Sequence, residues 1–325
     1  MSYTNGLLLE YISLLQGINH KCSKFKKSRQ YRFIERTEEC IPNCTSDISF
    51  TFEEKATAKI LTISISAICF LISCICLITL MIDECGFAES SQSRGSKNAI
   101  LKFSYAVPPY FSTFCCVFYS FGCLLSQLIN PEDYCLPSDE NSADLLLARE
   151  GHRNLPCIII YLLVFFFGSA ISAWWTIIAV SWCVALTSSS SSNQRNSDCL
   201  SSICHAYAWG IPAALTVAGI VAHKVESDEL LSVCLPGAGF NDESLLIFIL
   251  IPESFQIVLG LLFYVVGIVL ATIKKTSSNT ISEGTTSKRA KQDTKLLDML
   301  QNRVLIYGAI YIVMKVKIDS NYGTD

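Results

Sequence analysis

Long apolar runs separated by short polar segments fill most of this chain. Five of them are about 20 residues long or longer, the length that a helix needs to cross a bilayer: residues 60–82, 106–129, 157–187, 203–222 and 245–273. A helix satisfies its own backbone hydrogen bonds within lipid, as a spanning segment must. The pattern therefore predicts an all-α membrane protein with five complete spans.

A sixth apolar run begins at residue 304, but Lys315, Lys317 and Asp319 interrupt it after about three turns. It is too short to cross a bilayer unaided, and we expect a partial span over residues 304–316. The predicted organisation is a tail with a cysteine-containing hinge over residues 1–54, a transmembrane bundle over residues 55–318 and a second tail over residues 319–325.

Composition supports a membrane protein. The chain is 51% hydrophobic and 16% charged, whereas soluble domains carry about 25% charged residues. The net charge of -3 says little, because the charges are segregated between loops. We expect the lipid bilayer to be a partner of this chain, and we expect no nucleic-acid partner.

The distribution of basic residues predicts which side of the membrane each loop occupies. If the N-terminus lies outside, the Lys and Arg residues of the cytoplasmic loops, nine of which are named below, far outnumber the three of the external loops, which is the bias that orients membrane proteins. A basic stretch over residues 21–36 opposes this orientation, although the rule is weak so far from the first span. The nine residues are Arg94, Lys97, Arg195, Lys274, Lys275, Lys288, Arg289, Lys291 and Lys295.

The cysteines favour the same orientation. Of the 16 cysteines, six would lie outside, an even number that suits disulfides in an oxidising compartment, whereas the opposite orientation exposes three, Cys85, Cys199 and Cys204. The only N-x-S/T sequon, at Asn43, also falls outside. We therefore predict a multi-pass plasma-membrane protein with an extracellular N-terminus. The six cysteines, whose pairing the sequence leaves open, are Cys22, Cys40, Cys44, Cys135, Cys157 and Cys234.

No pattern in the sequence predicts enzyme chemistry. It contains no Gly-rich phosphate loop, no H-E-x-x-H pair, no recognisable Ser/His/Asp arrangement and no C-x-x-C pair. The histidines, His20, His152, His205 and His223, are not spaced to share a metal ion, and we interpret them as solvated or interfacial. We expect no catalytic residue, no metal site and no cofactor.

One carboxyl group lies inside a predicted span. Glu253 directly follows Pro252, eight residues into the fifth apolar run. An ionisable group in lipid is costly and usually faces the interior of a bundle or a cavity. Two interpretations stay open: Glu253 contacts a ligand or a neighbouring helix, or it lies close enough to the outer interface to be hydrated.

Tryptophans mark the third and fourth apolar runs. Trp182 and Trp209 lie where an aromatic belt forms at the headgroups, here near the cytoplasmic face. Trp174 and Trp175 lie in the middle of a span, and a belt does not account for them.

These tryptophans belong to longer patterns that resemble the Frizzled and Smoothened receptors, Frizzled more closely. The third run is similar to the Frizzled pattern W-W-x-I-L-x-x-x-W, and the fourth to H-x-x-A-W-x-x-P-A-x-x-T. Residues 225–234 are similar to the family's V-D-G-D-L-L-S-G-V-C external loop, and weaker likeness extends over about residues 40–312. The matched positions are Trp174, Trp175, Ile177, Ile178 and Trp182, then His205, Ala208, Trp209, Pro212, Ala213 and Thr216.

The resemblance implies a seven-transmembrane receptor-type helical bundle, of which this chain would carry five complete spans and a partial sixth. Frizzled receptors bind lipid-modified Wnt proteins outside the cell and recruit Dishevelled, sometimes G proteins, at the inner face. The resemblance thus implies a receptor that couples ligand to effector by helix rearrangement. It also implies disulfides from Cys157 to Cys234, from Cys44 to Cys135 and, less directly, from Cys22 to Cys40.

Two cytoplasmic features carry further implications. Arg303 matches the family's helix-six arginine, whose contact with a helix-seven tryptophan holds the receptor inactive. The basic loop matches the family's effector-facing loop, although charge that merely orients the spans explains its composition equally well. Its basic residues are Lys274, Lys275, Lys288, Arg289, Lys291 and Lys295.

The chain also departs from the family pattern. Residues 1–54 contain no counterpart of the Cys-rich Wnt-binding domain, the K-T-x-x-x-W effector motif is missing, and Glu253 stands where the family is usually apolar. We expect a divergent Frizzled gene product truncated at both ends, for which a Wnt-type ligand requires an upstream Cys-rich domain. The alternative is a membrane transporter or channel that uses Glu253, although no inverted repeat supports it.

Overall fold

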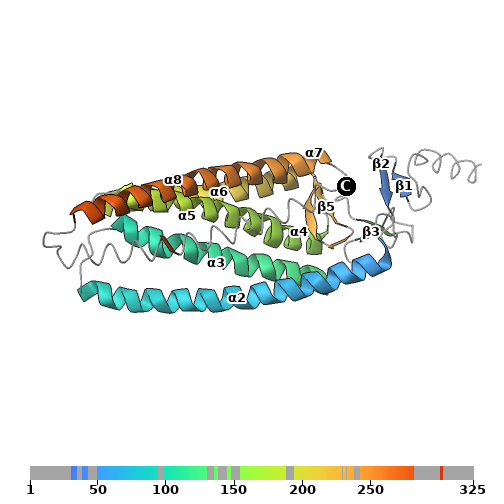
Figure 1. Ribbon diagram of the computed structural model, residues 1–325. Helices are drawn as coiled ribbons and strands as arrows, with labels where there is room; N and C mark the ends of the chain where they lie inside the picture. The colour runs from blue at the N-terminus through green and yellow to red at the C-terminus, as the bar shows by residue number, and fades with distance from the viewer. Residues whose placement is uncertain are drawn as a thin grey trace, which may run out of the picture. The chain divides into compact units, whose positions relative to one another are not determined.

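Figure 1 shows the computed structural model of the chain, which is mainly helical. It describes residues 31–34, 39–42, 50–93, 99–129, 135–137, 145–147, 154–187, 194–228, 230–231, 233–237, 242–281 and 301–302. The chain divides into two compact units. The first comprises Met1–Ile68, Ser120–Phe165 and Val217–Phe248, and the second comprises Cys69–Tyr119, Phe166–Thr216 and Ile249–Asp325.

Among the described residues, five helical stretches are long and apolar enough to cross a membrane, which confirms the predicted number of complete spans. Two of them are composite, with a π-helical turn joining their segments. In chain order the helical elements are α2 (Phe52–Ser93), α3 (Ala99–Leu128), α4 (Leu155–Tyr161), η4 (Leu162–Phe166), α5 (Phe167–Thr187), α6 (Gln194–Val221), α7 (Asp242–Leu245), η5 (Leu246–Leu250) and α8 (Ile251–Ile281).

The helices extend beyond the apolar runs because polar residues cap them. Thr51 and Glu54 form a capping box at the start of α2: the Thr51 backbone N–H donates to Glu54 Oε2 at 2.8 Å, and the Glu54 N–H donates to Thr51 Oγ1 at 3.4 Å. At the start of α4 the Asn154 side chain accepts the Cys157 N–H at 3.2 Å. The first helix therefore begins eight residues before the predicted span, at Phe52 instead of residue 60.

Among its described residues, the first unit contains three short antiparallel β-hairpins. They are β1 (Tyr31–Ile34) with β2 (Glu39–Pro42), β3 (Cys135–Pro137) with β4 (Leu145–Leu147), and β5 (Val225–Ser227) with β6 (Cys234–Pro236). In the third hairpin Ser227 pairs with Cys234, and β6 packs against α4.

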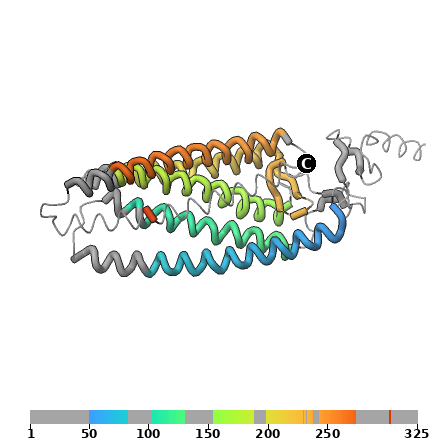
Figure 2. Tube along the Cα trace, viewed as in Figure 1, coloured from blue at the N-terminus to red at the C-terminus, as the bar shows by residue number. Residues whose placement is uncertain are grey.

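The second unit has its core around α5. Of the 21 residues of α5, 15 are buried, on all sides of the helix, as expected for a helix enclosed by protein. It packs against α8, and Figures 1 and 2, drawn from the same side, show the two helices next to each other along the unit. By contrast, only 6% of the most apolar 18-residue stretch within the span Phe52–Ile82 is buried. We infer that this helix presents most of its surface to lipid.

Candidate functional site

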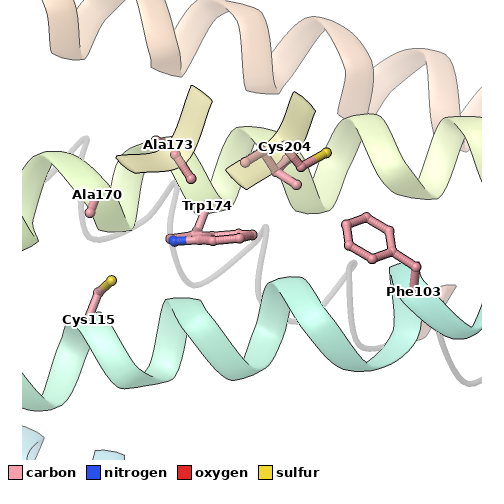
Figure 3. Close-up of a cluster of buried hydrophobic side chains, with 8 residues drawn as sticks. Phe103, Cys115, Ala170, Ala173, Trp174 and Cys204 are labelled. Carbon is pink, nitrogen blue, oxygen red and sulfur yellow. The ribbon is translucent and has the colours of Figure 1, made fainter. Parts of the chain in front are cut away.

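The motif residues of the third span assemble an aromatic cluster. Trp174 of α5 is fully buried, and its ring stacks on Phe111 of α3 with the ring centroids 5.1 Å apart. From α6, His205 meets the Trp174 ring edge-on at 5.2 Å and Trp209 does so at 5.8 Å. Figure 3 shows the Trp174 ring lying between its own helix and α3, which contributes Phe103 and Cys115. Three helices therefore meet at this one side chain.

His205 and Trp209 form a polar contact inside the cluster. They lie one turn apart on α6, and Trp209 Nε1 donates to His205 Nδ1 at 3.3 Å. Since Nδ1 accepts, this contact selects the neutral ring with its proton on Nε2. His205 is partly buried and packs edge-on against both Trp174 and Phe111, so it is not fully solvated. Large aromatic neighbours are what position this ring.

Further along α6, Pro212 is fully buried, and Thr216 lies one turn beyond it. The Thr216 hydroxyl donates to the Pro212 carbonyl at 2.7 Å. A proline in a helix interior lacks an N–H, so it removes one hydrogen bond of the helix. Pro212 and Thr216 thus lie at a point where the backbone hydrogen bonds of α6 are interrupted.

The remaining motif tryptophans pack against α8. Trp175 lies over Gly260 and Trp182 lies over Gly267; an added Cβ would meet these rings at 3.4 Å and 2.5 Å. Tyr264 packs between them, with ring centroids 6.1 Å from Trp175 and 6.2 Å from Trp182. The belt interpretation of Trp182 is wrong, because this side chain is fully buried. Small residues on α8 make room for large ones on α5.

This pairing could have been found in the sequence. Trp175 and Trp182 are seven residues apart, and so are Gly260 and Gly267, so both pairs recur after two turns. Matched spacings of large and small residues favour close packing of membrane helices. Of the cysteines at the start of α6, Cys204 is buried in the core cluster and Cys199 is exposed.

Glu253 contacts a neighbouring helix. The Ser172 hydroxyl of α5 lies 3.0 Å from Glu253 Oε1 and 2.8 Å from Oε2, so it donates to this carboxyl group. One turn further along, Thr176 Oγ1 lies 3.1 Å from the Gln256 carbonyl oxygen. The side chain of Glu253 is half-buried. Of the two interpretations that the sequence left open, contact with a neighbouring helix is therefore the one observed.

A disulfide joins Cys157, in the first turn of α4, to Cys234 of β6, with the two Cα atoms 5.5 Å apart. Gln127 of α3 reaches the same hairpin: its Nε2 donates to the Leu231 carbonyl at 2.5 Å. The turn of the hairpin is closed by Asp228, whose carboxylate accepts the Leu231 N–H at 2.8 Å. The loop before α7 is therefore held by one covalent and several polar contacts.

Several predicted site residues are not brought together by the described part of the chain. Four of them lie in strands or helices of which only the main chain is described: Cys40, Cys135, Lys274 and Lys275. The partial span over residues 304–316 lies outside the described residues. So do Cys22, Cys44, Asn43, Lys288, Arg289, Lys291, Lys295 and Arg303.

Comparison with known proteins agrees with the motif geometry. The model of the Frizzled/Smoothened family membrane region matches residues 99–319. Frizzled-10-A of Xenopus laevis is 26% identical over 295 residues, which is 90% of this chain and 45% of that protein. Human Frizzled-10 is 26% identical over 287 residues, 87% of this chain and 44% of that protein.

Frizzled-4 of Xenopus laevis is 27% identical over 294 residues, 90% of this chain and 51% of that protein. The chain thus spans about half the length of these curated relatives. The matched region contains α3, the aromatic cluster, the disulfide and the α5–α8 interface. The chain belongs to the Frizzled/Smoothened family, whose membrane region accounts for most of its length.

Proposed function

We propose that this chain is the membrane part of a Wnt receptor, which couples a ligand outside the cell to effectors inside it by a rearrangement of its helices. The aromatic cluster carries the proposal, because three helices meet at Trp174 and the family's motif residues supply the contact. Membership of the family supports it further. The transporter or channel suggested by Glu253 receives no support from the comparisons.

In the proposed topology the protein lies in the plasma membrane, and its N-terminus is outside the cell. The disulfide at the start of α4 supports it, since disulfides persist in oxidising compartments. The basic residues between the fifth and sixth apolar runs support it as well, because such charge favours the cytoplasmic side.

The proposed partners follow from the family and the orientation. Outside, the ligand is a lipid-modified Wnt-type protein, which a Cys-rich domain upstream of these residues would bind. Inside, Dishevelled or a G protein would bind the basic loop, whose residues include Lys288, Arg289 and Lys291. Clustered positive charge speeds the approach of an acidic partner and fixes its orientation when it binds.

Recruitment of Dishevelled tests this function. Cells that express the full chain and fluorescent Dishevelled should show Dishevelled at the plasma membrane. Reversing the charge of Lys288, Arg289 and Lys291 to Glu should abolish that recruitment, whereas Lys224→Glu, on the opposite side of the proposed topology, should leave it intact. Dishevelled that stays cytosolic, while the chain reaches the surface as abundantly as a known Frizzled, would contradict the proposal.

A further inference from the structure

Two of the spans change their helical type at one point along their length. In the third span the π-helical turn η4 (Leu162–Phe166) separates α4 from α5, and in the fifth span η5 (Leu246–Leu250) separates α7 from α8. A π-helical turn bonds each N–H to the carbonyl five residues back instead of four, so it holds an extra residue. Sharp bends in helices occur at such turns. Each turn is therefore a point at which its span can bend.

The segments after the two turns form one closely packed pair. α5 and α8 run parallel, because Ser172 of α5 contacts Glu253 of α8, and further along both helices the Cys183 thiol donates to the Phe263 carbonyl at 2.9 Å. The tryptophan rings of α5 pack over glycines of α8 along the same interface. α5 starts directly after η4, and α8 starts directly after η5. Both π turns therefore adjoin the same end of one packed pair.

The segments before the two turns are also linked to each other. Cys157 of α4 forms the disulfide with Cys234 of β6, and α4 packs against both strands of this hairpin. β6 ends at Pro236, and α7 begins shortly afterwards at Asp242. A bend at η4 would displace α4 and the hairpin, and with them the start of the fifth span. For this reason the two turns have to bend together.

The boundary between the two compact units lies inside both turns. It falls after Phe165 in η4 and after Phe248 in η5. Prolines interrupt the helices close to this boundary: Pro252 has no N–H for the carbonyl of Phe248, and Pro212 lies in α6 one turn before the boundary that follows Thr216. In three spans the regular α-helical bonding is thus interrupted at or next to the boundary between the units.

We propose that η4 and η5 are paired hinges, at which α4, the β5–β6 hairpin and α7 tilt as one body relative to the α5–α8 pair. This inference rests on the proposed receptor function, because it names the joint at which the helix rearrangement begins. In the proposed topology the disulfide-linked body faces outward, and the α5–α8 pair continues to the cytoplasmic side. A ligand that selects one tilt of the outer body would thereby act on the packed pair. Hinges in proteins consist of a few residues that absorb such a change in backbone angles.

Distances between spin labels test the hinges in the purified full chain, held in lipid nanodiscs. The nitroxides are attached to a keto amino acid, so that the native cysteines and the disulfide stay intact. One pair of labels, at Leu155 and Val258, lies on opposite sides of η4, and both side chains are exposed, by 68% and 66%. The reference pair, Val258 and Ile273, lies within α8, with Ile273 61% exposed. We expect a broad distance distribution for the first pair and a narrow one for the reference pair.

Deletion of one residue from each turn tests the cause of that breadth. Leu162 and Ile247 are exposed residues of η4 and η5. Removing both takes out the extra residues, so each span becomes a continuous α-helix with its flanks in their original rotation. The distribution of the Leu155–Val258 pair should then narrow to the width of the reference pair. The matched control is the double substitution Leu162→Ala and Ile247→Ala, which shortens the same side chains and keeps the turns; its distribution should remain broad.

Recruitment of Dishevelled shows whether the hinges serve the receptor. The double deletion should reach the cell surface and fail to recruit Dishevelled, and the double alanine variant should recruit it as the wild type does. A wild-type distribution across η4 that is as narrow as the reference overturns the hinges, and so does one that stays broad after the deletions. Normal recruitment by the double deletion overturns their part in coupling. If the wild type recruits no Dishevelled, the proposed function fails, and the distances still decide about the hinges.

Discussion

Trp182 of α5 and Gly267 of α8 face each other across the α5–α8 interface. A Cβ atom built on Gly267 would lie 2.5 Å from the Trp182 ring. Trp182 is fully buried, and its indole N–H has no hydrogen-bond acceptor among the described residues. The fit between the two residues is therefore steric. Helix packing in membranes relies on such close approaches because lipid removes the hydrophobic drive between helices.

Gly267→Ala should destabilise the protein, because the added methyl group forces the Trp182 ring or α8 to move. Overpacking of this kind costs about 1–3 kcal/mol, which thermal unfolding of the purified chain should detect. Gly210→Ala is the control, since the structure places nothing within 4 Å of its added Cβ among the described residues. Equal Tm values for the two variants would show that Trp182 does not fill this space.

Removing the Cys157–Cys234 bridge should cripple surface expression. We expect Cys157→Ser and Cys234→Ser each to lose about 2–5 kcal/mol of stability, with most of the protein retained inside the cell, as surface biotinylation would measure. Cys199→Ser, at an exposed free cysteine, should traffic normally. Normal trafficking of the two bridge variants would show that the third hairpin does not depend on the disulfide.

Trp209→Phe should isolate the hydrogen bond to His205. Phenylalanine keeps an aromatic ring against Trp174 but has no N–H, so we expect a loss of about 1 kcal/mol in the free energy of unfolding. Trp209→Ala removes the ring contacts too and should cost about 3–5 kcal/mol. If the two substitutions cost the same, the hydrogen bond rather than the ring is what stabilises the cluster.

Glycosylation at Asn43 would report the orientation of the membrane domain. An extracellular N-terminus passes through the compartment where glycans are added, so the chain from cells should migrate faster after endoglycosidase treatment. Asn43→Gln should abolish this change, because the sequence has no second sequon. A protease-protection assay provides an independent check: residues before α2 should be cleaved on intact cells, and protection there would reverse the proposed topology.

Hydropathy predicts the spans of this protein well and their contacts poorly. Length and polarity reveal that residues 157–187 cross a membrane, because the bilayer imposes those requirements on each helix separately. They do not reveal which face of the helix carries Trp182, and so they do not predict its burial against Gly267. The rotation of each helix depends on its neighbours, and the π-helical turns at Leu162–Phe166 and Leu246–Leu250 shift it further.

The candidate site is predicted unevenly for the same reason. Motif residues such as Trp174 and His205 can be identified in the sequence, yet their partner Phe111 lies on a helix that carries no such motif. Glu253 stands out because a carboxyl group in a span is rare, but Ser172, its partner on α5, is an ordinary residue. For the contacts of Trp174 with Phe111 and of Glu253 with Ser172, the sequence alone therefore identifies one partner and not the other.

The enclosure of α5 also bears on how the protein is made. A ribosome delivers α5 to the membrane before α6 and α8 exist, so Ser172 and Thr176 first meet lipid rather than the helices that will cover them. During that interval, hydroxyl groups can turn back to their own backbone, as Thr176 and Ser181 do in the finished structure. Biogenesis of this protein thus includes a stage at which α5 is still without the helices that will enclose it.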